Sequence, residues 1–203
     1  MNEPRAWHAR GYLPHYDDGR SIQTITYRLA DALPCDAVQQ LEEQTLDDEE
    51  RRAVIEHYLD AGHGTCELRD PAKARAVLQT WRHSEDIDYR LHAWVIMPNH
   101  VHVMIEPGKF RSLGAIIGAW KSISTRKILR IDLEREGLHR NAVPDGRESG
   151  PAKKRNLWQA DYYDRFIRDE RHYQAAVDYI QNNPVKARLV TSPSAWPWSS
   201  AAL

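Results

Sequence analysis

Two histidines separated by one residue are the first feature of the sequence that could carry out chemistry. His100 and His102 flank Val101 in a stretch of branched apolar residues, which favours a β-strand. Side chains alternate along a strand, so both imidazoles point to one face, with backbone positions about 7 Å apart. Two such imidazoles can bind one divalent cation, and a third ligand would leave positions open for a substrate. The alternative is a pair of partly buried histidines that only form hydrogen bonds.

A downstream tyrosine and asparagine extend this candidate site. Tyr179 and Asn183 lie four residues apart in a segment with helical spacing of apolar residues, so their side chains are neighbours. The carbonyl oxygen of Asn183 is a candidate third metal ligand, and Tyr179 would lie one turn away. A phenol can attack a phosphodiester and store the bond as phosphotyrosine, while a metal polarises the phosphate. Tyr162 and Tyr163 compete for this role, but they fall on an expected strand.

The surrounding pattern predicts the elements that must position these residues. Alternating apolar residues predict strands over 21–29, 89–97, 100–105 and part of 158–167. Helical spacing predicts helices over 70–83, 112–136 and 169–183. The last helix is expected to end before Pro184, because proline disfavours helical geometry at the preceding residue. This order of elements indicates a ferredoxin-like α+β fold with a central antiparallel sheet.

Two segments interrupt this pattern within a single domain spanning residues 1–203. Residues 36–64 are strongly acidic and have helical spacing, which predicts a helical insert. Residues 137–157 hold Gly, Pro, Asn and Ser together with a Lys-Lys-Arg run, which predicts a mobile loop. Neither segment contains a residue of the candidate site.

Composition narrows the class of protein. Hydrophobic residues make up 41% of the chain and charged residues 28%, as in ordinary globular proteins. No apolar run reaches membrane-spanning length, and the first ten residues lack the apolar stretch of a signal peptide. Cys35 and Cys66 lie far apart, which argues against a disulfide scaffold or a zinc ribbon. We therefore expect a cytoplasmic protein that does not associate with membranes.

The charge distribution and several side chains suggest a nucleic-acid partner. The net charge is −1, but residues 1–108 carry an acidic excess and residues 109–190 a basic one. Candidate phosphate contacts are Lys121, Arg126, Lys127, Arg165, Arg168, Arg171 and Lys186. Ordinary solvation is the alternative for each of them. Trp196 and Trp198 could stack on unpaired bases or dock on the core.

Several motifs, in the same order along the chain, resemble those of a known family. The segment from Trp94 to His102 (WVIMPNHVH) resembles the HUH segment of the single-tyrosine transposases. Six further segments resemble the REP-associated tyrosine transposases: 158–159 (WQ), 162–164 (YYD), 167–168 (IR), 178–180 (DYI), 183–186 (NPVK) and 196–200 (WPWSS). The resemblance reaches from about Arg10 to the C-terminus, and the acidic segment 36–64 is longer than compact members of the family need.

This resemblance carries expectations about structure and activity. It implies a ferredoxin-like HUH fold with a metal bound by His100, His102 and Asn183, and with Tyr179 as the nucleophile. It implies Mg²⁺ or Mn²⁺ as the metal. It also implies cleavage and rejoining of single-stranded DNA through a 5′-phosphotyrosine intermediate, at hairpins of repetitive extragenic palindromes (REP) flanked by a short guide sequence.

Two other functions share most of these features. A domesticated protein could bind hairpin DNA with little or no cleavage, although a pure binder has no use for the full set of candidate catalytic residues. An RNA-directed or hydrolytic metal phosphoesterase would use water as the nucleophile and leave no covalent adduct. In the leading hypothesis the partner is a single-stranded DNA hairpin, and the protein acts as a monomer or homodimer.

Overall fold

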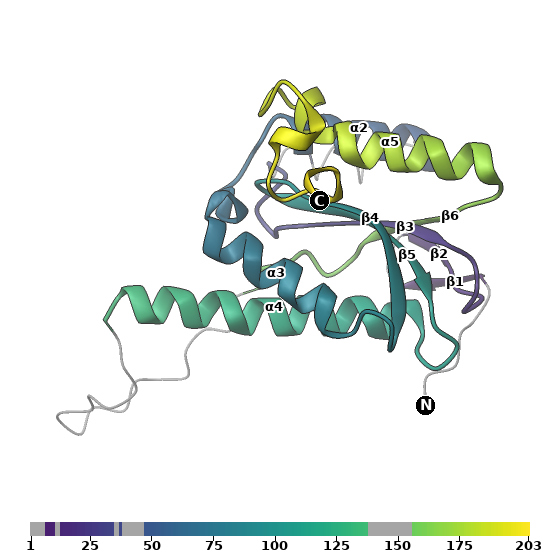
Figure 1. Ribbon diagram of the computed structural model, residues 1–203, viewed down its shortest axis with the longest axis horizontal. Coiled ribbons are helices and arrows are strands. Elements are labelled where there is room, and N and C mark those ends of the chain that lie inside the picture. Colours follow the sequence, from purple (N-terminus) through teal and green to yellow (C-terminus); the bar gives the residue numbers. More distant parts are fainter. Residues whose placement is uncertain (1–6, 11–12, 35–36, 38–46, 138–155) are drawn as a thin grey trace.

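A four-stranded antiparallel sheet forms the centre of the molecule (Figure 1). The computed structural model describes residues 7–10, 13–34, 37, 47–137 and 156–203. The sheet consists of β3 (Gln23–Arg28), β4 (Tyr89–Ile96), β5 (His100–Pro107) and β6 (Tyr163–Phe166), in the order β4-β5-β3-β6. Most of the loop predicted over 137–157 lies outside the described residues.

Helices cover both faces of this sheet. Figure 1 shows α3 (Pro71–His83) and α4 (Leu113–Arg135) on one face, and α2 (Asp48–Asp60) with α5 (Glu170–Lys186) on the other. The path β3-α3-β4-β5-α4-β6 is the strand-helix-strand pattern of a ferredoxin-like fold, which confirms the predicted α+β class. Among the described helices, none combines the length and apolar character needed to cross a membrane.

The three helices of the predicted pattern begin where the sequence indicates. Asp70, Ser112 and Asp169 each precede a helix, and each side chain accepts a hydrogen bond from a backbone N–H of the first turn. Such caps satisfy N–H groups that have no partner inside the helix. The acidic insert contributes α2, while residues 38–46 of that segment lie outside the described residues.

The end of α5 differs from the prediction. The helix passes through Pro184 and continues to Lys186, one turn beyond the expected end at Asn183. Proline removes only one backbone donor there, and the backbone N–H groups of Ala187 and Leu189 still bond to carbonyls of the last turn. The local preference against helix before a proline is therefore outweighed by the remaining bonds, and Lys186 comes to lie on the helix.

The C-terminal tail covers the open edge of β4. The backbone N–H of Ile96 donates to the carbonyl of Trp198 at 2.8 Å, and the indole N–H of Trp196 donates to the carbonyl of Ile96 at 3.0 Å. Both tryptophans are partly buried against the core. Trp196 and Trp198 therefore dock on the core, which was one of their two predicted roles beside stacking on bases. The tail that carries them protects the edge strand β4 from unwanted pairing.

A buried histidine ties the N-terminal hairpin to β6. The hairpin consists of β1 (Trp7–Arg10) and β2 (Leu13–Tyr16), and the His15 ring on β2 bonds to the carboxylates of Asp161 and Asp164. His15 is fully buried and stacks on Tyr162. Burial alone would lower the pKa of His15, but the two carboxylates outweigh it and raise the pKa to about 9.

This cluster makes stability depend on pH. Because the folded-state pKa of His15 lies above its unfolded value, its contribution is complete below about pH 6.5 and is lost as pH rises through about 9. We expect His15→Gln to lower the free energy of unfolding by about 2–3 kcal/mol at pH 6, and by less at pH 10. Urea unfolding of both proteins at the two pH values measures this, and an equal loss at both would contradict the charged state of His15.

Candidate metal and tyrosine site

The strand β5 separates core residues from site residues by simple alternation. Val101, Val103 and Ile105 pack into the main core, as predicted. The side chains of His100 and His102 point to the opposite face, which α5 covers, and they are 1% and 3% exposed. Their Nε2 atoms lie 3.1 Å apart, so the two rings converge on one point as the spacing predicts.

Each of these rings has a second polar partner on its other nitrogen. Nδ1 of His100 lies 2.8 Å from Oδ1 of Asn99, whose amide nitrogen donates to the carbonyl of His63. Nδ1 of His102 lies 2.7 Å from the hydroxyl of Thr26 on the neighbouring strand β3, with which His102 is in register. Such partners orient the imidazoles.

Helix α5 brings Asn183 to the same point. Asn183 is 1% exposed, and its Nδ2 atom lies 3.3 Å from Nε2 of His102. Its Oδ1 atom is buried, and no described residue offers it a hydrogen bond. The oxygen and nitrogen of a side-chain amide are distinguished by their hydrogen-bond partners, and a half-turn of the Asn183 amide exchanges their positions. Either orientation leaves a polar amide atom beside the two imidazoles.

This donor set fits a divalent cation. Burial, followed by the nearby His102 and Lys186, holds the pKa of His100 well below its usual value. A neutral imidazole is the form that binds a metal. In the described part of the chain no three His, Cys, Asp or Glu side chains form a group that could hold an ion. The third protein ligand would therefore be the Asn183 oxygen, leaving positions open for substrate oxygens.

Tyr179 lies one helical turn before Asn183 and faces the same histidine. Its ring centroid is 5.3 Å from that of His102, with the rings 77° apart. The ammonium group of Lys186 lies 5.7 Å from the centre of the Tyr179 ring and forms a 2.8 Å ion pair with Asp60. Asp60 is the last residue of α2, so the acidic insert reaches the border of the candidate site.

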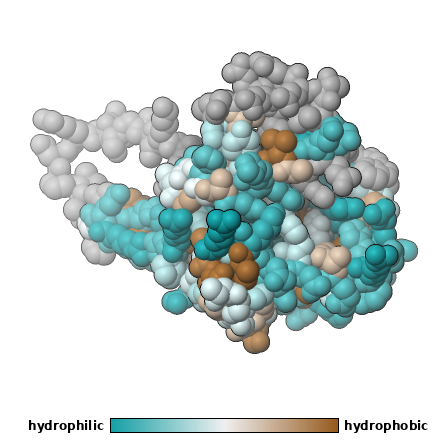
Figure 2. Space-filling model, turned by 90° about the horizontal axis from the view of Figure 1, so that it is seen from above, coloured by the Kyte–Doolittle hydropathy of each residue, from teal (hydrophilic) through white to brown (hydrophobic). Residues whose placement is uncertain are grey.

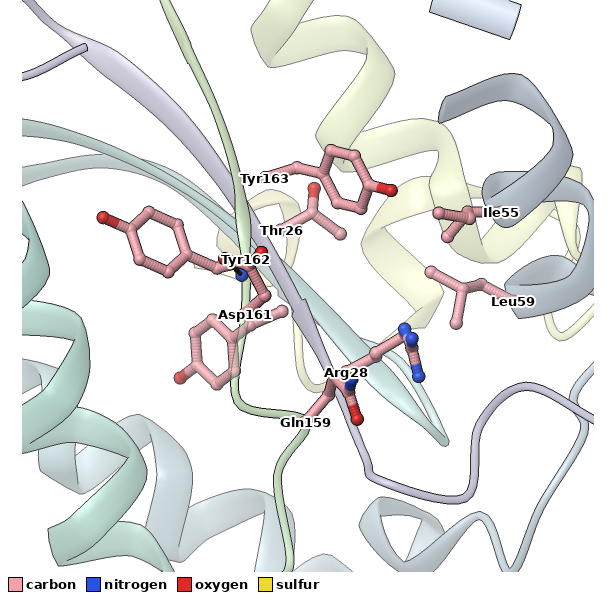
Figure 3. A pocket seen from close by; sticks show the side chains of 9 residues that line it. Thr26, Arg28, Ile55, Leu59, Gln159, Asp161, Tyr162 and Tyr163 are labelled. Carbon is pink, nitrogen blue, oxygen red and sulfur yellow. Dashed lines mark hydrogen bonds between the residues drawn. The ribbon is translucent and has the colours of Figure 1, made fainter. Parts of the chain in front are cut away.

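The two competing tyrosines lie on opposite faces of the sheet (Figure 3). Tyr162 is buried on the α4 face, and the centre of its ring lies 5.5 Å from the ammonium group of Lys121. Tyr163 pairs with Thr26 in the sheet and therefore shares the face of His102, two strands away. It lines a small pocket together with Arg28 and Leu59. Tyr163 is thus the competing tyrosine that merits an experimental control.

The predicted basic contacts divide between the two faces. Lys121, Arg126 and Lys127 lie on α4, which covers the face away from the two histidines. The Lys121 ammonium group donates to the carbonyls of residues 159, 160 and 161, so a phosphate would have to replace these bonds. Burial lowers its pKa to about 8. The α4 residues are therefore poorly placed to hold DNA at the candidate site.

The other predicted cations lie along the α5 side. Arg165 on β6 and Arg168 and Arg171 near the start of α5 are exposed. Viewed from the side of α2 and α5, the surface is mostly hydrophilic, with hydrophobic side chains in small groups (Figure 2). Lys186, at the far end of the helix, is the predicted cation that the structure brings next to Tyr179.

Three residues of the site were not predicted from the sequence. Thr26 lies in a predicted strand, but its contact with His102 depends on the register between β3 and β5. Asn99 directly precedes His100 in the sequence, and this adjacency could have indicated that it contacts the His100 ring. Asp60 ends an acidic helix, and nothing in its neighbourhood in the sequence indicates a contact with Lys186.

Comparisons with known proteins identify the family to which the chain is similar. The family described as "Transposase IS200 like" matches residues 69–183, more than half of the chain. A REP-associated tyrosine transposase of Escherichia coli (strain K12) is 26% identical over 117 residues, which are 57% of this chain and 56% of the relative. A Haemophilus influenzae protein of the same group is 29% identical over 117 residues, 57% of this chain and 61% of the relative. The chain therefore spans little more than half the length of these curated relatives.

A solved structure gives a further likeness. It is a REP-associated tyrosine transposase bound to a REP hairpin, with 20% sequence identity and a TM-score of 0.48, and the match covers 95% of this chain and 82% of that one. The family match includes β4, β5, α4 and the part of α5 that carries Tyr179 and Asn183. The chain belongs to the IS200-like transposase family.

Proposed function

We propose that this protein cleaves and rejoins single-stranded DNA beside REP-type hairpins, with Tyr179 as the nucleophile. The observation that carries the proposal is the contact of the Tyr179 ring with His102, at the point where His100 and Asn183 also meet. A phenol beside two imidazoles and an amide that can hold a cation offers a nucleophile and a metal site for phosphodiester exchange.

The proposed reaction exchanges one phosphodiester for another. The Tyr179 oxygen attacks the phosphorus, and the bond from phosphorus to the 3′-oxygen breaks. Tyr179 loses its phenolic proton, and the leaving 3′-oxygen gains a proton and becomes a 3′-hydroxyl. The 5′ end of the downstream strand stays on Tyr179 as a phosphotyrosine. Attack by a 3′-hydroxyl reverses these changes and joins the strand without ATP, because the bond energy is conserved.

His100, His102 and Asn183 would hold Mg²⁺ or Mn²⁺ in this proposal. When bound, the cation supplies positive charge that polarises the scissile phosphate. The two imidazoles favour Mn²⁺ over Mg²⁺ in affinity, while oxygen donors suit both. Lys186 adds a second positive charge beside the Tyr179 ring, where it can contact the phosphate that Tyr179 attacks.

A labelled hairpin oligonucleotide with Mn²⁺ tests the proposal and separates it from the alternatives. On a denaturing gel, the proposed enzyme yields a shortened strand and a protein-linked strand. A hairpin binder without cleavage leaves the oligonucleotide intact, and a water-dependent phosphoesterase yields shortened strands that carry no protein. Either of the last two results would replace the proposed function.

The form of the substrate gives a further prediction. A duplex backbone is stiff and paired on both sides, so we expect cleavage only where single-stranded DNA flanks a hairpin. The stem would be held through phosphates and the flank read by its bases, so binding should weaken steeply with salt.

Three oligonucleotides test this: a hairpin with its native flank, the same hairpin with a scrambled flank, and a blunt duplex. The first should be cleaved well and the other two poorly. Equal cleavage of the duplex would contradict the need for a single strand, and equal cleavage of both hairpins would contradict reading of the flank.

A further inference from the structure

We propose that Thr26 is a positioning residue of the metal site, whose hydroxyl allows His102 to change tautomer when the cation binds. The inference rests on the proposed function insofar as a cation binds at His100 and His102. It concerns the two rings separately, because their second partners differ in chemistry. The Asn99 oxygen can only accept a hydrogen bond from His100, whereas the hydroxyl of Thr26 can either donate a hydrogen bond to His102 or accept one from it.

The tautomer of His100 is determined by its surroundings. Asn99 donates from its amide nitrogen to the carbonyl of His63 at 3.0 Å, which directs its Oδ1 toward His100. An amide oxygen only accepts, so Nδ1 of His100 must carry the proton that spans the 2.8 Å between them. With the ring neutral, Nε2 of His100 therefore presents a lone pair, both with and without a cation.

The tautomer of His102 follows from that of His100 when no cation is bound. The two Nε2 atoms lie 3.1 Å apart, which is a hydrogen-bond distance, so one of them must donate. Since His100 has its proton on Nδ1, the donor is Nε2 of His102. Nδ1 of His102 then has a lone pair and accepts from the Thr26 hydroxyl at 2.7 Å.

The Asn183 amide fits the same assignment. With the half-turn that exchanges the amide atoms, Oδ1 would lie 3.3 Å from Nε2 of His102 and would share its N–H with Nε2 of His100. This orientation gives Oδ1 a hydrogen-bond partner and moves Nδ2 to the buried position that has none among the described residues. It is the orientation in which Asn183 can act as an oxygen ligand.

Cation binding requires His102 to change. Both Nε2 atoms must then present lone pairs to the metal, so the proton of His102 has to lie on Nδ1. Nδ1 becomes a donor, and the Thr26 hydroxyl must turn and accept. The hydroxyls of threonine and serine can switch from donor to acceptor in this way, whereas valine can neither donate nor accept. A carbonyl in this position could only accept, so it would pair only with the metal-bound form of His102.

Titration with Mn²⁺ in the absence of DNA tests the proposal. Thr26→Val should weaken Mn²⁺ binding about 10- to 100-fold, the usual cost of losing the partner of a ligating histidine. Thr26→Ser should bind close to the unchanged protein, because it restores the hydroxyl. Thr24→Val is the matched control, since Thr24 lies on the same strand and face but its hydroxyl donates to the carbonyl of Arg165. Isothermal titration calorimetry gives all four dissociation constants.

Nitrogen NMR of the imidazoles provides a second readout that needs no variant. In the unchanged protein, Nδ1 of His102 should be unprotonated without Mg²⁺ and protonated with it, while Nδ1 of His100 stays protonated. The same His102 tautomer in both states, or Mn²⁺ affinity unaffected in Thr26→Val, would overturn the role of Thr26 and leave the metal site standing. Failure of the unchanged protein to bind Mn²⁺ or Mg²⁺ would overturn the proposed metal site itself.

Discussion

Tyr179→Phe is expected to abolish strand cleavage while leaving the fold and hairpin binding intact. The substitution removes only the phenolic oxygen, and the ring keeps its contact with His102. Loss of a nucleophile typically lowers turnover by at least about a thousandfold, so no product should be visible on a denaturing gel. Hairpin affinity, measured by gel shift, should be unchanged because phosphate and base contacts supply it.

Tyr163→Phe is the matched control for this experiment. Tyr163 shares the site face of the sheet, but it lies two strands from His102 and is not on α5. We expect this variant to cleave normally. Normal cleavage by Tyr179→Phe together with loss of cleavage in Tyr163→Phe would show that Tyr163 on β6 is the nucleophile.

His102→Ala is expected to remove metal-dependent cleavage with little change in hairpin affinity. His102 contacts His100, Thr26, Asn183 and the Tyr179 ring, so its loss removes a metal ligand from the centre of the cluster. Even loss of a ligand's partner typically costs 10–100-fold in metal affinity. Cleavage in Mn²⁺ should therefore fall by more than about a hundredfold.

His92→Ala provides the control for a histidine that does not contact the site. His92 lies on β4 and hydrogen-bonds the Tyr173 hydroxyl at 3.0 Å, away from the two converging rings. Its loss should leave the metal dependence of cleavage unchanged. Cleavage by His102→Ala that persists in the presence of a chelator would contradict the metal site.

The convergence of the two histidines could be predicted because it depends on local geometry. Strand alternation places His100 and His102 on one face in any fold that keeps residues 100–105 extended. Helical spacing similarly places Tyr179 and Asn183 on one face. That these two faces meet was a hypothesis drawn from the chemistry of the residues and implied by the resemblance to a family. Neither spacing determines it, since contact between α5 and β5 is a tertiary property.

The contacts that the sequence did not indicate depend on register and on long-range packing. Thr26 meets His102 because β3 pairs with β5 in one register, and a shift of one residue would turn Thr26 to the other face. Asp60 reaches Lys186 because α5 continues past Pro184 to Lys186, whereas the local rule predicted its end at Asn183. Lys121 lies beside the segment that precedes β6, and its carbonyl partners are about 40 residues away in sequence.

Identification of the covalent product tests the central claim most directly. Wild-type protein is incubated with Mn²⁺ and a hairpin oligonucleotide labelled on the strand downstream of the cut, then denatured and digested with trypsin. The account predicts that the label stays attached to the peptide containing Tyr179, and that mass spectrometry places the phosphate on that side chain. Cleaved DNA that carries no peptide, or a peptide linked through Tyr163, would contradict it.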